Sequence, residues 1–587
     1  MSKRTATSPS RWKTAQDRRA ALVDRFPVWK PATLHGMLDR IAAEFPERIY
    51  VATDEQQWTY AEIRAWSERL AACLVEAGVE RGDRVAVVMA NYPAFIALKY
   101  AISRVGATCV PVNILNRRDE LAYVLRQAEV RALVTMDCFR GNDYLAALDQ
   151  IAPGWETGGG VALPHLSAVF VFPVGEAPLR QGVRTLSALE ASGRAFNGYP
   201  DADPDAVSDI LYTSGTTGSP KGAMLTHDQY LRAAFGSAYW RAFDDGWKIL
   251  YALPMYHVFG YAEGMLAAMI VGGVAVPRVR FDPDDMLDAA ERHRVDDILM
   301  VPTMTRLVLD AQRARPRALR DLKAVLSSGQ RSPEGMFDEI FELLHPHEVT
   351  TGYGMTETTA TTTLTRPEDP RDWLLTQGPM REVGPAGDPA LGGKLVDYRV
   401  VDTVTEKVAA PGEIGELRAK GPGITQGYYK KPDETAAAFD ADGWFRSGDL
   451  GFFDEKGRLI LAGRLKETYR CGGEQVMPTE IEDVLTSHPD VVQAHVVPVP
   501  DERMGETGAA WVVLRDGASI SLEDLRARCE ASLARFKVPK YVLKIDAADL
   551  PTTASGRARK FLLSERAIAQ LGLSSGRSAA PSAQAGN

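Results

Sequence analysis

Strand-like and helix-like patterns alternate along much of the chain, and this alternation constrains the fold more than any other feature of the sequence. Within residues 59–134, the short β-branched run 84–89 is followed by the amphipathic stretch 93–104. The same order returns around residues 248–253 and 298–302. Helices that connect parallel strands cover both faces of their sheet. We therefore predict an α/β protein with a large core of doubly wound sheets.

The pattern changes twice toward the C-terminus. After Val383, short strands and turns follow one another, which predicts a barrel-like subdomain. Beyond Lys466 the patterns indicate a small α+β domain, and the polar end of the chain is typical of a disordered tail. The predicted organisation is an N-terminal extension at 1–32, a large domain at 33–465 with its barrel-like part at about 384–465, a small domain at 466–570 and a tail at 571–587.

Composition and charge exclude several classes of protein. The net charge of -9 indicates no basic surface, so a nucleic acid is not expected as a partner. The most apolar stretch, 251–279, is interrupted by Pro254, His257 and Glu263, which predicts buried core and no membrane span. Five widely spaced cysteines argue against a disulfide framework or a zinc site, and residues 1–20 lack the apolar segment of a secretory signal. We predict a cytoplasmic protein.

A glycine- and hydroxyl-rich segment at residues 212–222 follows a short apolar run. Its sequence, YTSGTTGSPKG, supplies hydroxyl donors, backbone N–H groups and one lysine, which together suit the phosphates of a nucleotide. It differs from the GxxxxGK[ST] loop, because Lys221 is followed by Gly222. By composition alone, a plain linker is an equal alternative. The candidate phosphate contacts are Thr213, Ser214, Gly215, Thr216, Thr217, Gly218 and Lys221.

The segment 212–222 closely resembles the signature of the adenylate-forming superfamily, which holds acyl-CoA synthetases, nonribosomal peptide adenylation domains and luciferases. The resemblance extends over residues 33–565 and is carried by further motifs in the same order as in that superfamily. They are PMYHVFG at 254–260, TGYGMTET at 351–358, SGD at 447–449, GRLKE at 463–467, Gly472 and Gly473 before PTEIE at 478–482, and SGRARK at 555–560. The chain is thus similar to an acid–thiol ligase that forms an acyl-CoA through an acyl-AMP intermediate.

The resemblance implies a binding site for ATP, or for AMP as part of acyl-AMP. Thr356 and Glu357 match the residues at the α-phosphate, and Glu357 matches the ligand of Mg²⁺, a hard cation that prefers oxygen. Tyr353 matches the residue that packs on adenine, with Ser328, Gly329 and Gln330 across the slot. Asp449 matches the acceptor of the ribose hydroxyls and Arg464 the cation nearby. The neighbours Gly352, Gly354 and Met355 belong to the same predicted site.

The acid is expected beside His257, which matches the ring that the superfamily places next to the reacting carboxylate; a core histidine is the alternative. Amino-acid-activating relatives have an aspartate in this stretch, and this chain has none. We therefore expect an acid without an α-amine. Residues 301–304, Gly352 and Met355 are predicted to border the acyl group.

The superfamily alternates between two poses of its small domain, one for adenylation and one for attack by the thiol of coenzyme A. Lys466 matches the hinge, where only backbone dihedral angles must change. Gly472 and Gly473 match the loop along the pantetheine tunnel, where glycine allows a close approach. Domain 466–570 is therefore predicted to be mobile.

The chain departs from the superfamily at the mobile catalytic lysine. That lysine ends the pattern (S/T)GK, whereas Ser555 and Gly556 are followed here by Arg557. A planar guanidinium is not interchangeable with a compact ammonium, and we do not expect Lys560 to take the place of that lysine. Our main prediction is an enzyme that mainly converts acyl-AMP, made by a separate ligase, into acyl-CoA. The alternatives are a complete two-step ligase and a non-catalytic acyl-nucleotide binder. A homodimer is a possible assembly, and the sequence does not determine the oligomeric state.

Overall fold

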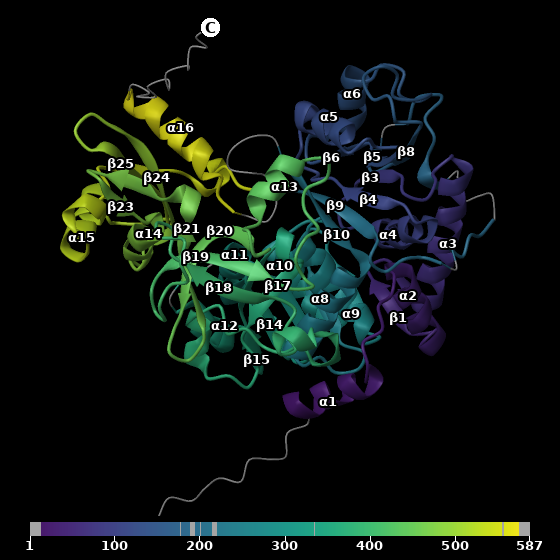
Figure 1. Ribbon diagram of the computed structural model, residues 1–587, viewed down its shortest axis with the longest axis horizontal. Coiled ribbons are helices and arrows are strands. Elements are labelled where there is room, and N and C mark those ends of the chain that lie inside the picture. The colour runs from purple at the N-terminus through teal and green to yellow at the C-terminus, as the bar shows by residue number, and fades with distance from the viewer. Residues whose placement is uncertain are drawn as a thin grey trace, which may run out of the picture. The chain divides into compact units, whose positions relative to one another are not determined.

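Two sheets of mostly parallel strands form the centre of the larger part of the molecule. In the computed structural model, residues 13–176, 178–187, 194–199, 201–213, 220–330, 332–333, 335–553 and 557–573 are described (Figure 1). The chain divides into two units. Unit 1 comprises Met1–Arg399, Arg418–Ser447 and Phe453–Leu459, and unit 2 comprises Val400–Leu417, Gly448–Phe452 and Ile460–Asn587.

The seven-stranded sheet of unit 1 has its strands in the order β15-β14-β13-β11-β12-β1-β2. All neighbours are parallel except β1 and β2. The strands are β1 (Ile49–Ala52), β2 (Gln57–Thr59), β11 (Lys248–Tyr251), β12 (Val274–Pro277), β13 (Asp297–Met300), β14 (Ala324–Ser327) and β15 (Glu348–Thr350). Every residue of β13 and β14 is buried, as expected for parallel strands that are covered on both faces.

The six-stranded sheet of unit 1 has the order β10-β9-β4-β3-β5-β8, and only β9 and β10 are antiparallel. Its strands are β3 (Arg84–Val88), β4 (Thr108–Pro111), β5 (Ala132–Met136), β8 (Ala168–Phe172), β9 (Val207–Thr213) and β10 (Lys221–Thr226). The sequence motif at 212–222 therefore lies at a hairpin between two strands. These two sheets confirm the predicted α/β core.

Helices connect the strands of unit 1. Many begin at a residue that caps them: Thr59, for example, accepts a hydrogen bond from the backbone N–H of Glu62, whose side chain bonds back to Thr59. The helices are α1 (Ala15–Arg25), α2 (Leu34–Glu44), α3 (Tyr60–Glu76), α4 (Pro93–Val105), α5 (Arg118–Gln127), α6 (Tyr144–Ile151), α8 (His227–Trp240), the π-helix η1 (Phe259–Leu266), α9 (Ala267–Ile270), α10 (Pro283–His293), α11 (Pro302–Ala314), α12 (Met336–Leu343) and α13 (Pro432–Ala438).

The apolar stretch 251–279 forms η1, α9 and β12, all largely buried, as predicted. No helix in the described ranges combines the length and the apolar character needed to cross a membrane. The remaining elements are β6 (Cys138–Phe139), β7 (Asn142–Asp143), β16 (Gly352–Met355), η2 (Thr356–Thr358), β17 (Ala360–Leu364), η3 (Arg371–Leu375), η4 (Gly384–Ala386) and η5 (Pro389–Leu391).

A four-stranded sheet follows where short strands were predicted. Its order is β18-β19-β20-β21, and each strand contains residues of both units. The strands are β18 (Asp397–Val401), β19 (Gly415–Lys420), β20 (Phe445–Phe453) and β21 (Leu459–Arg464), and the turn η6 (Leu465–Glu467) comes next. The exact domain boundaries and the hinge at Lys466 stay predictions.

Unit 2 is built around a sheet of order β23-β22-β25-β24, with β26 parallel to β25. Side chains alternate along β25: Ala510 and Val512 join a core with Leu485 of α14, and Trp511 joins another with Leu563 of α16. The Trp511 Nε1–H donates to the Leu563 carbonyl at 3.0 Å. The elements are β22 (Tyr469–Cys471), β23 (Glu474–Val476), α14 (Pro478–Thr486), β24 (Val491–Asp501), β25 (Gly505–Leu514), α15 (Leu522–Ser532), η7 (Arg535–Lys537), β26 (Tyr541–Lys544), η8 (Ala547–Asp549) and α16 (Lys560–Leu571) (Figure 1).

Candidate active site

The two ends of the predicted phosphate loop are fixed by the hairpin of β9 and β10. Thr213 at the end of β9 pairs with Lys221 at the start of β10. Asp209, earlier in β9, forms a buried ion pair with Lys99 of α4. The predicted contacts Ser214, Gly215, Thr216, Thr217 and Gly218 lie outside the described residues.

Glu357 lies close to both ends of this loop. Its Oε1 accepts a hydrogen bond from the Tyr428 hydroxyl at 3.1 Å, and the Thr213 hydroxyl lies 3.5 Å from the same oxygen. The Lys221 ammonium lies 4.9 Å from the centre of the Tyr428 ring. Burial, and then the Glu357 carboxylate, raise the pKa of Tyr428, so its hydroxyl stays a donor. Structure thus brings together Thr213, Lys221 and Glu357, and adds Tyr428, which the sequence motifs did not include.

This donor set fits the predicted Mg²⁺. Within the described residues, no group of three His, Cys, Asp or Glu side chains could hold a metal ion. A single buried carboxylate suits Mg²⁺, which takes its other ligands from substrate phosphates and water. Glu357 would hold the ion, whose charge would neutralise phosphate oxygens. Neighbouring Thr356 is also buried, at the start of η2.

The predicted adenine slot is built where the end of β14 lies close to the start of β16. The Ser328 hydroxyl donates to the Gly352 carbonyl at 2.7 Å. Gly329 has a φ of +94°, and a Cβ there would lie 3.2 Å from Val301 Cγ1. A Cβ on Gly354 would lie 1.8 Å from the Ala360 carbonyl oxygen, so only glycine allows β16 and β17 to approach so closely.

The remaining predicted residues of this slot lie in β16 or just after β14. Tyr353 is 7% exposed, and its ring centre lies 5.9 Å from that of Tyr398. Gln330 and Met355 are partly exposed at the ends of these segments. Their roles at adenine and at the acyl group stay predictions.

His257 begins the turn that leads into the π-helix η1. Its backbone N–H donates to the Pro254 carbonyl, and its own carbonyl accepts from the Tyr261 N–H, each at 3.1 Å. Burial lowers the pKa of His257, so the imidazole is neutral near pH 7. Its Nδ1 is buried without a hydrogen-bond partner in the described part of the chain. A neutral ring with an unused nitrogen suits a neighbour of a reacting carboxylate.

In unit 2, Asp449 of β20 and Arg464 of β21 form an ion pair. The Arg464 Nε lies 2.7 Å from Asp449 Oδ1, and the Asp449 side chain is 7% exposed. The guanidinium holds the carboxylate in one orientation. The pairing agrees with the implied roles of the two residues at one ribose, which stay predictions.

A second charge cluster surrounds the predicted hinge. Glu467 accepts from Arg557 Nη2 at 3.0 Å, and its other oxygen lies 2.9 Å from Lys560 Nζ. Lys560 also pairs with Glu482 of α14 at 2.8 Å. Burial by itself lowers the pKa of Lys560, but Glu482 and Glu467 outweigh it and raise that pKa. Lys560 therefore pairs with two carboxylates, and its not replacing the lysine of the pattern (S/T)GK stays a prediction.

Of the three residues Ser555, Gly556 and Arg557, which match the pattern (S/T)GK, only Arg557 is described. Desolvation and the nearby Arg464 cation lower the pKa of Arg557, although a guanidinium stays protonated. Its partner Glu467 follows Lys466 directly. The motif GRLKE contains Glu467, but nothing in the sequence identified it as the partner of Arg557.

Gly472 and Gly473 form the two-residue turn between β22 and β23. Their φ angles are +61° and +92°, and Cys471 and Glu474 pair on either side. Two positive φ values favour glycine at both positions of such a hairpin. A Cβ on Gly472 would lie 2.4 Å from Met504 Cε. Burial raises the pKa of the neighbouring Cys471 thiol, so a reactive thiolate is not favoured.

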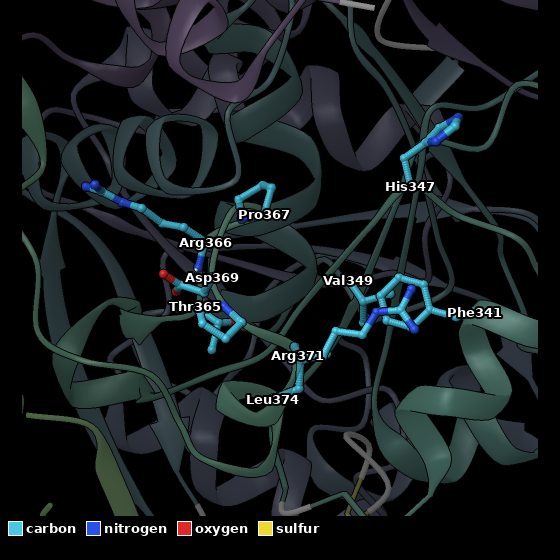
Figure 2. A pocket seen from close by; sticks show the side chains of 10 residues that line it. Phe341, His347, Val349, Thr365, Arg366, Pro367, Asp369, Arg371 and Leu374 are labelled. Carbon is cyan, nitrogen blue, oxygen red and sulfur yellow. Dashed lines mark hydrogen bonds between the residues drawn. The ribbon is translucent and has the colours of Figure 1, made fainter. Parts of the chain in front are cut away.

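A pocket elsewhere in unit 1 does not serve the predicted chemistry. Figure 2 shows it between Phe341 of α12 and the segment 365–374, with the Arg371 guanidinium 3.7 Å from the Phe341 ring centre. Its cavity of about 190 Å³ is smaller than the roughly 300–1,000 Å³ of ordinary ligand pockets. None of the predicted site residues lines it.

The sequence of the chain was compared with family models and with known proteins, and it matches AMP-binding enzymes. Residues 38–429 match the family model described as AMP-binding enzyme, and residues 480–557 match the model of the AMP-binding enzyme C-terminal domain. The chain is 32% identical to the putative acyl-CoA synthetase YngI of Bacillus subtilis, over 93% of this chain and 98% of that protein.

Solved structures give the same result. ATP-bound MatB from Rhodopseudomonas palustris superposes with a TM-score of 0.77 at 28% identity, over 91% of this chain and 98% of that one. The o-succinylbenzoate CoA synthetase of Bacillus subtilis, in complex with its acyl-adenylate intermediate, gives 0.74 at 27%, over 90% and 97%.

Proposed function

The chain belongs to the family of AMP-binding enzymes and is an acyl-CoA ligase, and from this premise we propose that it carries out both half-reactions. In the first, a carboxylate oxygen attacks the α-phosphorus of ATP and pyrophosphate leaves. In the second, the sulfur of coenzyme A attacks the acyl carbon and AMP leaves. The substrates are a carboxylic acid without an α-amine, ATP and coenzyme A.

The observation that carries this proposal is the position of Glu357 between the two ends of the phosphate loop. Next to Thr213 and Lys221, this carboxylate would hold the Mg²⁺ that neutralises the phosphates of ATP. Acyl-AMP has no β- and γ-phosphates, so a Mg²⁺ ligand at this place supports adenylation. The relatives support the complete ligase over the partial enzyme that the sequence favoured: MatB holds ATP, and the o-succinylbenzoate enzyme holds an acyl-adenylate. The loss of adenylation has no support beyond the single exchange at Arg557.

Arg557 then supplies the positive charge that a lysine supplies in relatives. Its guanidinium is a permanent cation, so it stabilises negative charge on the α-phosphate during attack. Because Arg557 is bonded to Glu467, it has to leave this partner before it can act. Lys466, exposed in the turn η6, gives the place where the backbone rotates.

The neutral imidazole of His257 orients the substrate. Its unused Nδ1 lies in a buried environment, where a hydrogen bond is stronger than in water. Asp449 and Arg464 hold the ribose side of the nucleotide. Glycines at 472 and 473 leave room for the narrow pantetheine arm in the second half-reaction.

The test separates the two half-reactions. Candidate acids are supplied with ATP and Mg²⁺ and pyrophosphate is measured, and synthetic acyl-AMP is supplied with coenzyme A and acyl-CoA is measured. We expect pyrophosphate at ordinary ligase rates. Arg557→Ala should lower its release on the order of 10²–10³-fold, as for other lost transition-state contacts, and should leave the second signal nearly unchanged.

Control variants sharpen this result. Arg559→Ala removes a nearby cation that lies against Phe561, and it should leave both signals unchanged. Arg557→Lys should restore or raise pyrophosphate release. Conversion of acyl-AMP without any pyrophosphate release from the acids would instead establish the partial enzyme, and acyl-AMP binding without either product would establish a binder.

A further inference from the structure

The π-helix η1 contains a buried carboxylate that the mechanism above does not use. Glu263 is 1% exposed. Its Oε2 has no hydrogen-bond partner among the described residues, and no ion pair in the described part of the chain includes it. Native proteins pair nearly all such groups, and an exception needs an explanation. π-Helical segments occur frequently at functional sites.

Glu263 lies on the side of η1 that meets the predicted substrate site. Residues four apart in a π-helix share nearly the same face, which places Glu263 on the face of Phe259. A Cβ on Gly329 would lie 3.6 Å from Phe259 Cε1 and 3.2 Å from Val301 Cγ1. Gly329 and Val301 both belong to the segments predicted to border the nucleotide and the acyl group.

The other oxygen of this carboxylate is fixed by the backbone. Glu263 Oε1 accepts a hydrogen bond from the Thr361 N–H at 3.1 Å. Thr361 lies in β17 and pairs with Gly354, next to Tyr353 in the TGYGMTET motif. One oxygen is therefore anchored between η1 and the adenine segment. The second oxygen is held rigidly in place by the same anchor.

A comparison with Glu348 shows why packing alone does not account for Glu263. Glu348 also has a buried oxygen without a hydrogen-bond partner in the described ranges, but its other oxygen pairs with the Arg18 guanidinium. That cation compensates its charge. Glu263 has only a neutral backbone donor, and a buried carboxylate is costly unless further donors bond to it.

We propose that Glu263 determines which acid this enzyme activates, and that the acyl group carries a hydrogen-bond donor which bonds to Glu263 Oε2. The inference rests on the proposed function and names its substrate class: acids with a hydroxyl or an amine beyond the α-carbon. A site built around a buried acceptor rejects analogues that lack the donor, because the acceptor is then left unpaired.

The experiment uses matched sets of acids that differ at one carbon only. Octanoates are compared as unsubstituted, hydroxy, amino and oxo members, and cinnamates as unsubstituted, hydroxy, amino and methoxy members, with substituents placed along the chain or ring. In at least one set, the unaltered enzyme should use the hydroxy or the amino member with a kcat/KM roughly 10–100 times that of the unsubstituted one. The two donor arms tell a hydroxyl from an amine.

Glu263→Gln replaces the hydrogen-bond acceptor that faces the acyl group with a donor. The amide carbonyl still accepts from the Thr361 N–H, whereas the amide NH₂ replaces Oε2 and donates. The amino member, whose nitrogen donates but hardly accepts, should therefore lose its advantage, and the acceptor-only member (oxo or methoxy) should gain one, mainly through KM. The hydroxy member should keep part of its advantage, because its oxygen can also accept from the amide. A purely structural role would lower kcat/KM for all members by the same factor. Glu348→Gln is the matched control and should leave the ratios unchanged.

Binding of unreactive acyl-sulfamoyl adenosines, measured by calorimetry, tests the inference without catalysis. The analogue with the preferred donor should bind more tightly to the unaltered protein than the unsubstituted one, and Glu263→Gln should abolish this difference for an amine and reduce it for a hydroxyl. Equal affinities, or equal kcat/KM values within every set, would overturn the role of Glu263. A failure of the proposed function looks different: no pyrophosphate is released, while the order of analogue affinities is retained.

Discussion

Each of the two units pairs a lysine of low exposure with carboxylate groups, and the two lysines differ in what they stabilise. Lys99 and Asp209 in unit 1 have side chains that are 1% and 0% exposed. Lys560 in unit 2 lies between Glu467 and Glu482 and is 16% exposed. The first pair fixes a strand, β9, four residues before the phosphate loop. The second pair holds Glu467 at the end of the turn η6, which contains the predicted hinge residue Lys466.

The difference in solvent exposure between the Lys99 pair and the Lys560 cluster indicates how easily each can change partners. An ion pair without access to water cannot exchange partners without leaving an uncompensated charge. A pair near solvent loses less when it opens, because water replaces part of the interaction. The Lys99–Asp209 pair is therefore expected to keep β9 in one position, whereas the Lys560 cluster can rearrange at a lower cost in free energy.

Removal of the fully buried cation should have the largest effect on stability. Lys99→Met leaves the Asp209 carboxylate buried without its partner, which should lower the free energy of unfolding by about 3–5 kcal/mol. Urea denaturation followed by circular dichroism measures this loss. The double variant Lys99→Met, Asp209→Asn should recover most of it, and a loss below about 1 kcal/mol would contradict the role assigned to the pair.

The corresponding change in unit 2 should cost less. Lys560→Met should lower the free energy of unfolding by about 2 kcal/mol, because water reaches Glu467 and Glu482 in part. Hydrogen exchange of peptides from α14 and η6 should accelerate locally. Lys544→Met, at an exposed position of β26, is the control and should change neither quantity. An equal loss for Lys99→Met and Lys560→Met would remove the contrast between the units.

Each unit also has a histidine that stays neutral in the folded state. Burial, and then Arg104, lower the pKa of His35 to about 4, and burial lowers that of His495 to about 4. Unfolded histidine titrates near 6.5 and gains a proton first, so stability is complete above pH 6.5 and falls as the pH drops toward 4.

Between pH 7 and 5.5, we expect His35 to account for a loss of about 1 kcal/mol in the free energy of unfolding, and His495, which is partly exposed, for less. Urea titrations of His35→Gln and His495→Gln at both pH values measure the two contributions. Unchanged acid sensitivity in His35→Gln would contradict the assignment.

An exposed ion pair gives the smallest effect. Lys13 Nζ lies 3.0 Å from Asp244 Oδ1, with the lysine side chain 57% exposed. Lys13→Met should change the free energy of unfolding by at most about 0.5 kcal/mol, and added salt should reduce even this. A larger loss, measured by the same urea titration, would show that exposure does not rank these three lysines.

The α/β core could be predicted from the sequence because its buried parallel strands are continuous apolar runs. β13, for example, is wholly buried and overlaps the predicted residues 298–302. Local sequence determines this result. Thr213, Lys221 and Glu357 were named from their motifs, and the structure places them close together.

Contacts between distant segments could not be predicted in the same way. Tyr428 lies in no recognisable motif and meets Glu357 only because the chain folds back over β10. Glu467 forms ion pairs with Arg557 and Lys560 because the packing of unit 2 brings these distant residues together. The π-helix η1 has the composition of an ordinary buried helix, so neither its geometry nor the unpaired oxygen of Glu263 could be predicted from periodicity.

Trp511 gives unit 2 an optical reporter of its own. The other nine of the ten tryptophans lie in the stretches of chain that form unit 1. Since the Trp511 indole is enclosed and bonded to a carbonyl of α16, its fluorescence responds to the packing of that helix. Incorporation of 5-fluorotryptophan would add one ¹⁹F resonance from this unit, which Trp511→Phe identifies. The small unit can thus be followed during turnover without any attached dye.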